Sequence, residues 1–167
     1  FSESDIAKMP LSIYAASKRA NELMAYSYHS LYGLNTTGLR FFTVYGPWGR
    51  PDMAMYIFTE KILNNQPISV FNKGVMQRDF TYIDDIISGV RSSIDKNFKN
   101  EIFNLGNDKS EDLMEMISII ERKTGKKAIV KFEDMQLGDV KKTHADISRS
   151  RQLLSYNPKL KDRAKEL

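Results

Sequence analysis

The longest regular pattern of apolar and polar positions lies between residues 13 and 32, where apolar side chains recur at helical spacing. Ser12 stands in front of this segment and Gly33 follows it, which are the residue types that begin and end a helix. The pattern predicts one long helix. Its larger apolar residues form a stripe that we expect to be core, or in part an interface: Leu23, Tyr26, Tyr28 and Leu31.

After Gly33 the apolar residues follow the pattern of β-strands, and further along the chain strand patterns alternate with helical patterns. Short β-type runs predict strands at 36–44, 68–71, 102–105 and 128–132. Helical spacing predicts four further helices, the first at 55–63 and the last shortly after Asp146. The second begins at a cap at Asp84 or Asp85 and extends to 94. The third begins at a cap at Ser110, has Glu111 and Asp112 in its first turn, and ends at Gly125. Strands that alternate with helices are typical of an α/β fold with a parallel sheet.

Composition agrees with a folded chain: 41% of the 167 residues are hydrophobic and 11% are aromatic. The sequence has no cysteine, which suits a reducing compartment, and no apolar run of membrane-spanning length. We therefore expect a cytoplasmic protein that has no membrane partner.

The net charge of +4 raises the question of nucleic acid binding, which we do not expect. Much of the excess is late in the chain, at 126–127, 141–142 and the tail at 159–165, and the aromatic residues fall in strand-like segments. This distribution is typical of a solvated face. His29 and His144 each stand without another ligand type nearby in the sequence, so no metal site is expected.

Candidate chemistry begins with Tyr14 and Lys18, which are four residues apart and so share one face of the predicted helix. A phenol has a reference pKa of about 10, so it acts as a base near pH 7 only if a positive charge stabilises its anion. A lysine ammonium one turn away supplies such a charge. The pair alone is weak evidence, because eight tyrosines in a lysine-rich chain produce about one such spacing by chance.

A longer series of motifs carries a resemblance. P-L-S-I-Y-A-A-S-K leads into the start of the helix, G-L-R-F-F-T-V-Y-G-P-W-G-R-P-D-M follows the helix, and R-D-F-T-Y-I-D-D and G-D-V come later in the same order. The chain resembles the extended short-chain dehydrogenase/reductases, the NAD-dependent epimerase/dehydratase family, and within them is most similar to the UDP-glucuronate 4-epimerases. The resemblance extends from Phe1 to about Tyr156.

The resemblance implies roles for individual residues. Tyr14 and Lys18 would be catalytic and would contact the nicotinamide of NAD, which Phe42 and Val44 would also line. Thr43 would face the sugar, Val70 and Phe71 would flank the uracil, Arg78 would reach the diphosphate and Asp139 the ribose or phosphates. The alternative for Arg78 is an ion pair with Asp79 or Asp84. Leu137 replaces a proline that the family usually has two residues before this aspartate.

For the fold, the resemblance implies the C-terminal part of a Rossmann-like doubly wound parallel sheet with an intermingled smaller substrate-binding domain. Residues 1–50 would end the NAD-binding domain. Residues 51–167 would mainly bind the nucleotide sugar, with some elements returning to the sheet. The glycine-rich turn that holds pyrophosphate in such folds is absent from the sequence, so we expect the N-terminal half to lie outside this chain. In the full-length enzyme, two copies would form a homodimer through the helix at 13–32.

The implied reaction is NAD-dependent epimerisation at carbon 4 of a UDP-uronic acid. Arg50 stands between Gly49 and Pro51 in a turn-rich loop, and with Thr43 it would select a sugar carboxylate. Pairing of Arg50 with Asp52 as a loop brace is the alternative. Other functions left open are those of a 4,6-dehydratase or 4-reductase and of a noncatalytic nucleotide-sugar-binding fragment.

Overall fold

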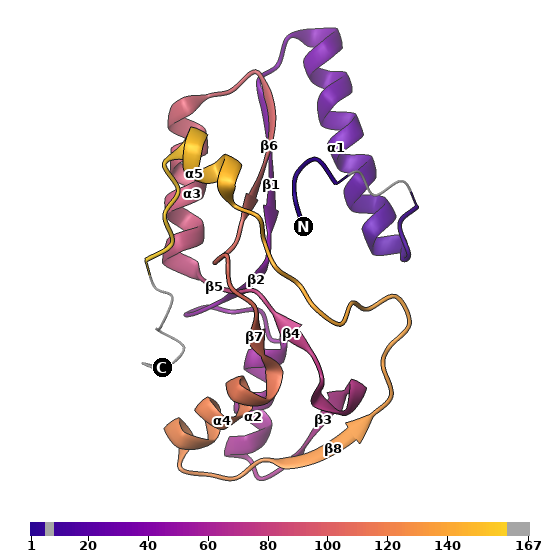
Figure 1. Ribbon diagram of the computed structural model, residues 1–167, viewed down its shortest axis with the longest axis vertical. Coiled ribbons are helices and arrows are strands. Elements are labelled where there is room, and N and C mark those ends of the chain that lie inside the picture. Colours follow the sequence, from indigo (N-terminus) through magenta and orange to yellow (C-terminus); the bar gives the residue numbers. More distant parts are fainter. Residues whose placement is uncertain (6–8, 160–167) are drawn as a thin grey trace.

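The computed structural model describes residues 1–5 and 9–159, and its elements gather in the two halves seen in Figure 1. We call the part with α1, β1, β6, α3 and α5 the upper half, and the part with α2, β3, α4 and β8 the lower half. The short strands β2, β5, β4 and β7 lie between them (Figure 1). Helices and parallel strand pairs alternate along the chain, which confirms the predicted α/β class.

The helix α1 (Ile13–Tyr32) has the predicted ends. The Ser12 hydroxyl accepts a hydrogen bond from the amide of Ala15 at 3.1 Å, and Gly33 ends the helix with a φ of 66°. The predicted core stripe is wrong for the chain as described: no residue of α1 is buried, and Leu23, Tyr26, Tyr28 and Leu31 are all exposed. An apolar pattern at helical spacing predicts the helix, but it does not show what covers these side chains.

In the upper half, β1 (Thr36–Phe41) pairs in parallel with β6 (Asn100–Leu105), with Thr36 opposite Asn100 and Phe41 opposite Leu105. The helix α1 lies on one side of this pair, and α3 (Ile83–Lys96) and α5 (Ser148–Leu154) lie on the other (Figure 1). A buried apolar cluster joins β6, α3, α5 and the segments before and after α5: Ile86, Phe103, Leu105, Ala145, Ile147, Leu154 and Tyr156.

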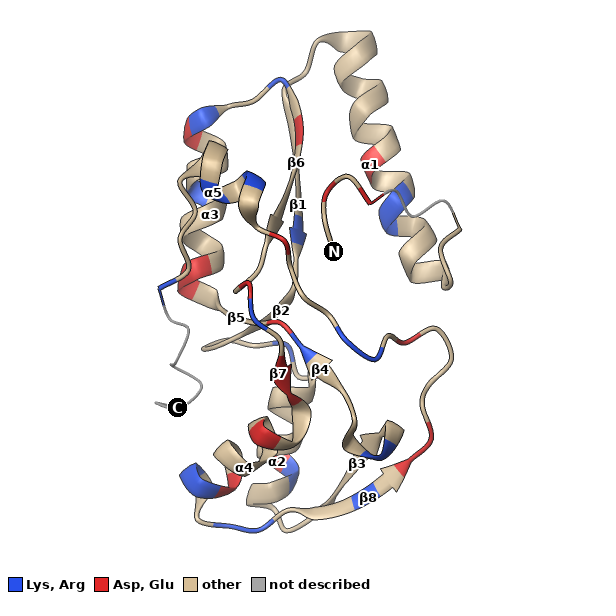
Figure 2. Ribbon diagram, viewed as in Figure 1, with Lys and Arg blue, Asp and Glu red and all other residues tan. Residues whose placement is uncertain are grey.

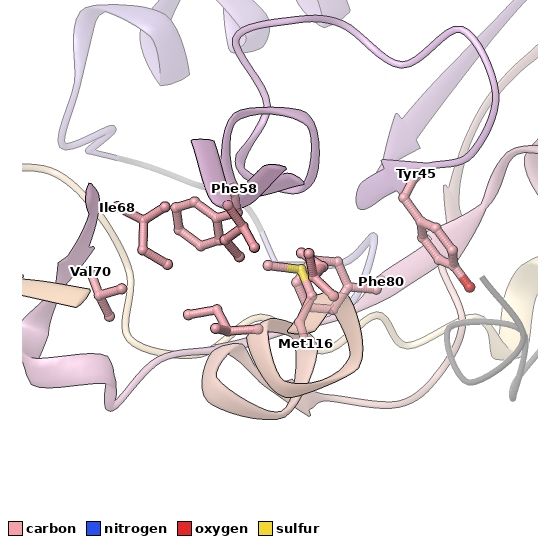
Figure 3. Close-up of a cluster of buried hydrophobic side chains, with 9 residues drawn as sticks. Tyr45, Phe58, Ile68, Val70, Phe80 and Met116 are labelled. Atoms are coloured by element: carbon pink, nitrogen blue, oxygen red, sulfur yellow. The ribbon is translucent and has the colours of Figure 1, made fainter. Parts of the chain in front are cut away.

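In the lower half, β3 (Pro67–Phe71) pairs in parallel with β8 (Ile129–Glu133), and α2 (Ala54–Leu63) and α4 (Leu113–Thr124) pack beside them. A short 3₁₀ turn, η1 (Asn72–Gly74), follows β3. Figure 3 shows the core of this half, which also reaches β2 and β5: Tyr45, Phe58, Ile62, Ile68, Val70, Phe80, Met116, Ile117 and Ile120.

The strand predicted at 36–44 is two strands. After β1 the amide of Phe42 still donates to Leu105 of β6 at 3.2 Å, but the amide of Thr43 donates to Asp79 at 3.0 Å. From there β2 (Thr43–Tyr45) pairs in parallel with β5 (Phe80–Tyr82). The chain changes partner at one residue, which the continuous apolar run did not reveal.

Two predicted helix caps are also wrong. The helix α3 begins at Ile83 after Tyr82, so Asp84 and Asp85 lie inside its first turn. Residues Glu111–Asp112 form β7, antiparallel to β4 (Gln77–Arg78), and α4 begins only at Leu113. Ser110 instead donates its hydroxyl to the carbonyl of Thr143 at 2.7 Å, because that segment runs beside it.

A buried carboxylate joins segments from distant parts of the sequence. Asp79 is fully buried, and its oxygens accept hydrogen bonds from the amides of Asn107 at 2.7 Å and Ala145 at 3.0 Å and from the Thr81 hydroxyl at 3.2 Å. Its own amide donates to the Thr143 hydroxyl at 3.0 Å. Asp79 therefore ties β5, the turn after β6 and the segment before α5 into one arrangement.

Figure 2 shows that charged residues are distributed over both halves, with acidic and basic positions interspersed along the ribbon. The two histidines have partners that their isolation in the sequence did not reveal: His29 Nδ1 is 2.8 Å from the carbonyl of Leu34, and His144 Nε2 is 3.1 Å from Asp108 Oδ1. Within 1–5 and 9–159, no three His, Asp or Glu side chains are grouped so that they could hold a metal ion. No described helix combines the length and apolarity that a membrane crossing requires. Residues 160–167, which carry three of the eight positive charges in the segments named above, lie outside the described residues.

Candidate active site

A cleft of about 1210 Å³ lies against α1, the carboxyl end of β1, the loop after β2 and the first half of α3. In open α/β sheets the carboxyl ends of parallel strands are where ligands bind. The cleft brings together six of the residues proposed from the sequence: Tyr14, Lys18, Phe42, Thr43, Val44 and Arg50.

Tyr14 and Lys18 form the α1 side of the cleft. The Lys18 Nζ atom lies over the Tyr14 ring, 5.3 Å from its centroid, as the four-residue spacing predicts. The Tyr14 side chain is 71% exposed in this chain, so its hydroxyl is accessible to a ligand in the cleft. An accessible phenol with an ammonium group one turn away is suited to proton transfer.

The opposite side of the cleft is apolar and comes from the point where β1 ends and β2 begins. Phe42 and Val44 are half-buried and pack against the core of the upper half, so their positions are held from behind. Thr43 is half-buried and adds a hydroxyl to the cleft lining. The wall is therefore mostly apolar with one hydroxyl, a surface suited to an aromatic ring beside a polar group.

Arg50 lies at the mouth of the cleft and is paired with Asp52. Its Nε is 3.0 Å from Asp52 Oδ1 and its terminal nitrogen is 2.5 Å from Oδ2, while both side chains stay largely exposed. The guanidinium holds the pKa of the Asp52 carboxyl below its usual value by hydrogen bonding. The pairing in the structure is thus the loop brace, which engages Nε and one terminal nitrogen of Arg50.

Arg78 and Asp139 lie outside the lining of the cleft, but the structure joins them to each other. The Arg78 guanidinium donates to both Asp139 oxygens, at 2.9 and 3.1 Å, and to the carbonyl of Gln77 at 2.9 Å. Sequence reasoning expected Asp79 or Asp84 as the alternative partner of Arg78, and the structure has Asp139. The pair connects β4 to the segment that follows β8.

Val70 and Phe71 lie on opposite faces of β3. Val70 is fully buried in the lower core, so its side chain is covered in the chain as described, and its place beside the uracil stays a prediction. The reason is the two-residue period of a strand: burial alternates along β3, and Val70 falls on the inner face with Ile68. Phe71 is half-buried on the other face.

Four charged residues of the cleft lining were missed by the sequence analysis: Asp5, Arg19, Glu22 and Arg40. Glu22 of α1 accepts hydrogen bonds from Arg40 of β1, at 2.7 and 3.1 Å, and from Arg19 at 2.8 Å. The pKa of Glu22 is lowered, chiefly by the hydrogen bonds from Arg40. Glu22 stands four residues after Lys18, so extending the Tyr14–Lys18 spacing by one more turn would have found it.

The comparisons with known proteins place this geometry in a family context. A model of the NAD dependent epimerase/dehydratase family matches residues 2–106. An uncharacterized protein of Methanocaldococcus jannaschii is 54% identical over 96% of this chain and 49% of its own length. UDP-glucuronate 4-epimerase 4 of Arabidopsis thaliana is 44% identical over 95% of this chain and 40% of its own length.

Among solved structures, the UDP-glucuronic acid 4-epimerase of Bacillus cereus, in complex with UDP-glucuronic acid and NAD, superposes with a TM-score of 0.88. It is 37% identical, and the match covers 94% of this chain and 51% of that one. The predicted Rossmann-like fold class is confirmed by this likeness. The chain spans about half the length of the curated relatives it matches.

Proposed function

Because the chain belongs to the NAD-dependent epimerase/dehydratase family, we propose that it forms part of an enzyme that epimerises carbon 4 of a UDP-uronic acid. The substrates would be UDP-glucuronate and UDP-galacturonate, with NAD as cofactor. The observation that carries the proposal is the cleft in which Tyr14 and Lys18 line the same cavity as Thr43 and Arg50. Oxidation of a uronate hydroxyl by NAD requires a group that takes the proton, and a guanidinium can bind the uronate carboxylate.

The residues present fit one end of NAD. Phe42 and Val44 supply an apolar surface for a nicotinamide ring, and Lys18 supplies a donor beside it. No glycine-rich turn between a strand and a helix occurs in the sequence, so the pyrophosphate would be held by residues outside this chain. NAD, when bound there, would supply the hydride acceptor for carbon 4.

Tyr14 would take the proton of the sugar's 4-hydroxyl as the hydride leaves, and it would give the proton back when the hydride returns to the opposite face. The hydride and the proton leave and return together, so no net oxidation results. Lys18 stabilises the charge that forms on the phenol oxygen, because its ammonium lies over the ring. Phe42 and Val44 exclude water from the reacting carbon.

Three further assignments belong to the proposal. Arg78, with Asp139, would lie near the nucleotide diphosphate, and the half-buried Phe71 would lie beside the base. The boundary between cofactor-binding and substrate-binding regions would fall near residue 50. The exposed apolar residues of α1 would contact a second subunit.

The test is Tyr14→Phe in the complete enzyme, which keeps the ring and removes the hydroxyl. We expect turnover of UDP-glucuronate to fall about 10²- to 10⁴-fold, with substrate affinity little changed. Tyr26→Phe is the matched control, because Tyr26 is another exposed tyrosine of the same helix and does not line the cleft; it should leave turnover unchanged. Retention of more than a tenth of the activity by Tyr14→Phe would mean that another group moves the proton.

A further inference from the structure

An ion pair that the helical spacing allows is absent from the cleft in the described part of the chain. Lys18 and Glu22 are four residues apart on α1, and both line the cleft. Oppositely charged side chains at this spacing are neighbours on a helix and commonly pair. Yet no carboxylate among residues 1–5 and 9–159 forms an ion pair with Lys18, whose ammonium lies over the Tyr14 ring instead.

Glu22 is held away from Lys18 by two guanidinium groups. Arg40 binds both of its oxygens, with Nε 2.7 Å from Oε1 and a terminal nitrogen 3.1 Å from Oε2, and Arg19 binds Oε2 at 2.8 Å. The Glu22 side chain is 17% exposed and that of Arg40 is 29% exposed, so the pair is partly shielded from water. Bidentate pairing in such surroundings is stronger than an exposed lysine pair on a helix.

The remaining charges near Tyr14 are few. The charged residues that line the cleft besides Lys18 are Asp5, Arg19, Glu22, Arg40 and Arg50. Arg50 is close enough to interact electrostatically with Tyr14, but it is paired with Asp52. The other phenol of the lining, Tyr45, is buried. Lys18 is therefore the unpaired cation nearest to Tyr14 along α1 in the part of the chain that is described.

We propose that Arg40 is a positioning residue, which holds Glu22 so that the Lys18 ammonium stays unpaired and available to Tyr14. This rests on the proposed function for the role of Tyr14 but not for the pairing itself. Without Arg40, Glu22 turns one helical turn back and pairs with Lys18. The carboxylate then offsets the positive charge that supports proton transfer by Tyr14.

The first experiment measures the pairing of Lys18 directly. The complete protein, without substrate, is labelled briefly with acetic anhydride, and the labelling rate at Lys18 is followed by mass spectrometry. Arg40→Met should slow labelling by about two- to fivefold, since pairing keeps the amine protonated. Glu22→Gln breaks the same ion pair from the other side and should not slow it. Arg40→Lys should retain most of the original rate.

The second experiment uses turnover. In Arg40→Met the acid limb of the kcat/KM profile should move to higher pH, and in Glu22→Gln it should not. A merely structural ion pair would give the same change in both variants, and that symmetry would overturn the proposal. An unchanged labelling rate in Arg40→Met would overturn it as well.

Should Arg40→Met not fold, Arg40→Gln provides the test, because a neutral amide cannot hold both oxygens of the Glu22 carboxylate as the guanidinium does. It should slow Lys18 labelling in the same direction, and an unchanged or faster rate would contradict the proposal. The labelling experiment needs no substrate, so an unchanged labelling rate would refute the role of Arg40 without refuting the proposed epimerase function. Full activity of Tyr14→Phe would instead refute the epimerase mechanism.

Discussion

Replacing Asp79 by asparagine should destabilise the chain more than any exposed carboxylate replacement. Asparagine keeps the shape and one acceptor oxygen but puts an NH₂ group where the second oxygen was. If the retained oxygen stays with the amide of Asn107, the new NH₂ faces the amide of Ala145, and two donors meet in a fully buried site.

The magnitude follows from the bonds that are lost. A hydrogen bond to a charged group contributes about 1.5 to 3 kcal/mol, and leaving a buried donor unsatisfied costs about 1 to 3 kcal/mol. We expect a total near 2 to 4 kcal/mol, because the retained oxygen offsets part of the loss. For a chain of this length each kcal/mol lowers the Tm by about 2 to 4 °C, so the Tm should fall by about 4 to 16 °C.

Thermal unfolding followed by circular dichroism measures this effect. The matched control is Asp134→Asn, an exposed carboxylate that should change stability by less than about 0.5 kcal/mol. Hydrogen exchange adds a local readout, since the amides of Asn107 and Ala145 should lose protection before those of α2. A Tm decrease below about 2 °C, or no loss of protection at these two amides, would refute the reasoning.

Three further predictions follow from single contacts. Arg50→Ala in the complete enzyme should reduce activity on uronates at least about tenfold more than on UDP-glucose, because a charge-assisted bond contributes 1.5 to 3 kcal/mol; Asp52→Asn is the control that keeps the guanidinium, and an equal loss on both sugars would favour the loop brace. Gly89→Ala should cost about 1 to 3 kcal/mol, because a Cβ there lies 2.8 Å from both methyl groups of Leu105; denaturant unfolding measures it, and an unchanged midpoint would contradict the packing. Burial raises the pKa of the Tyr156 phenol, so its contribution to stability is present below the unfolded value near 10 and is lost as the pH rises through the folded value. The chain should therefore lose stability above about pH 10 more steeply than Tyr156→Phe, and parallel stability curves for the two proteins would contradict this.

Local chemistry was sufficient to predict the features that depend on neighbours in the sequence. Ser12 and Gly33 delimit α1 because capping and left-handed backbone are properties of a few adjacent residues. The position of Lys18 over Tyr14 follows from the helical period alone. The same holds for the alternation of strands and helices, which indicates the α/β class.

Long-range pairing decided the rest. Arg78 meets Asp139 across 61 residues, and Arg40 meets Glu22 across 18, and the sequence has several carboxylates that would satisfy either guanidinium equally well. Which carboxylate each arginine binds depends on which segments the fold brings side by side. The same is true of the change of strand partner between Phe42 and Thr43. Val70 shows the limit within one strand: the period of two predicts that alternate residues share a face, but only the packing of β3 against α2 and α4 determines which face is buried.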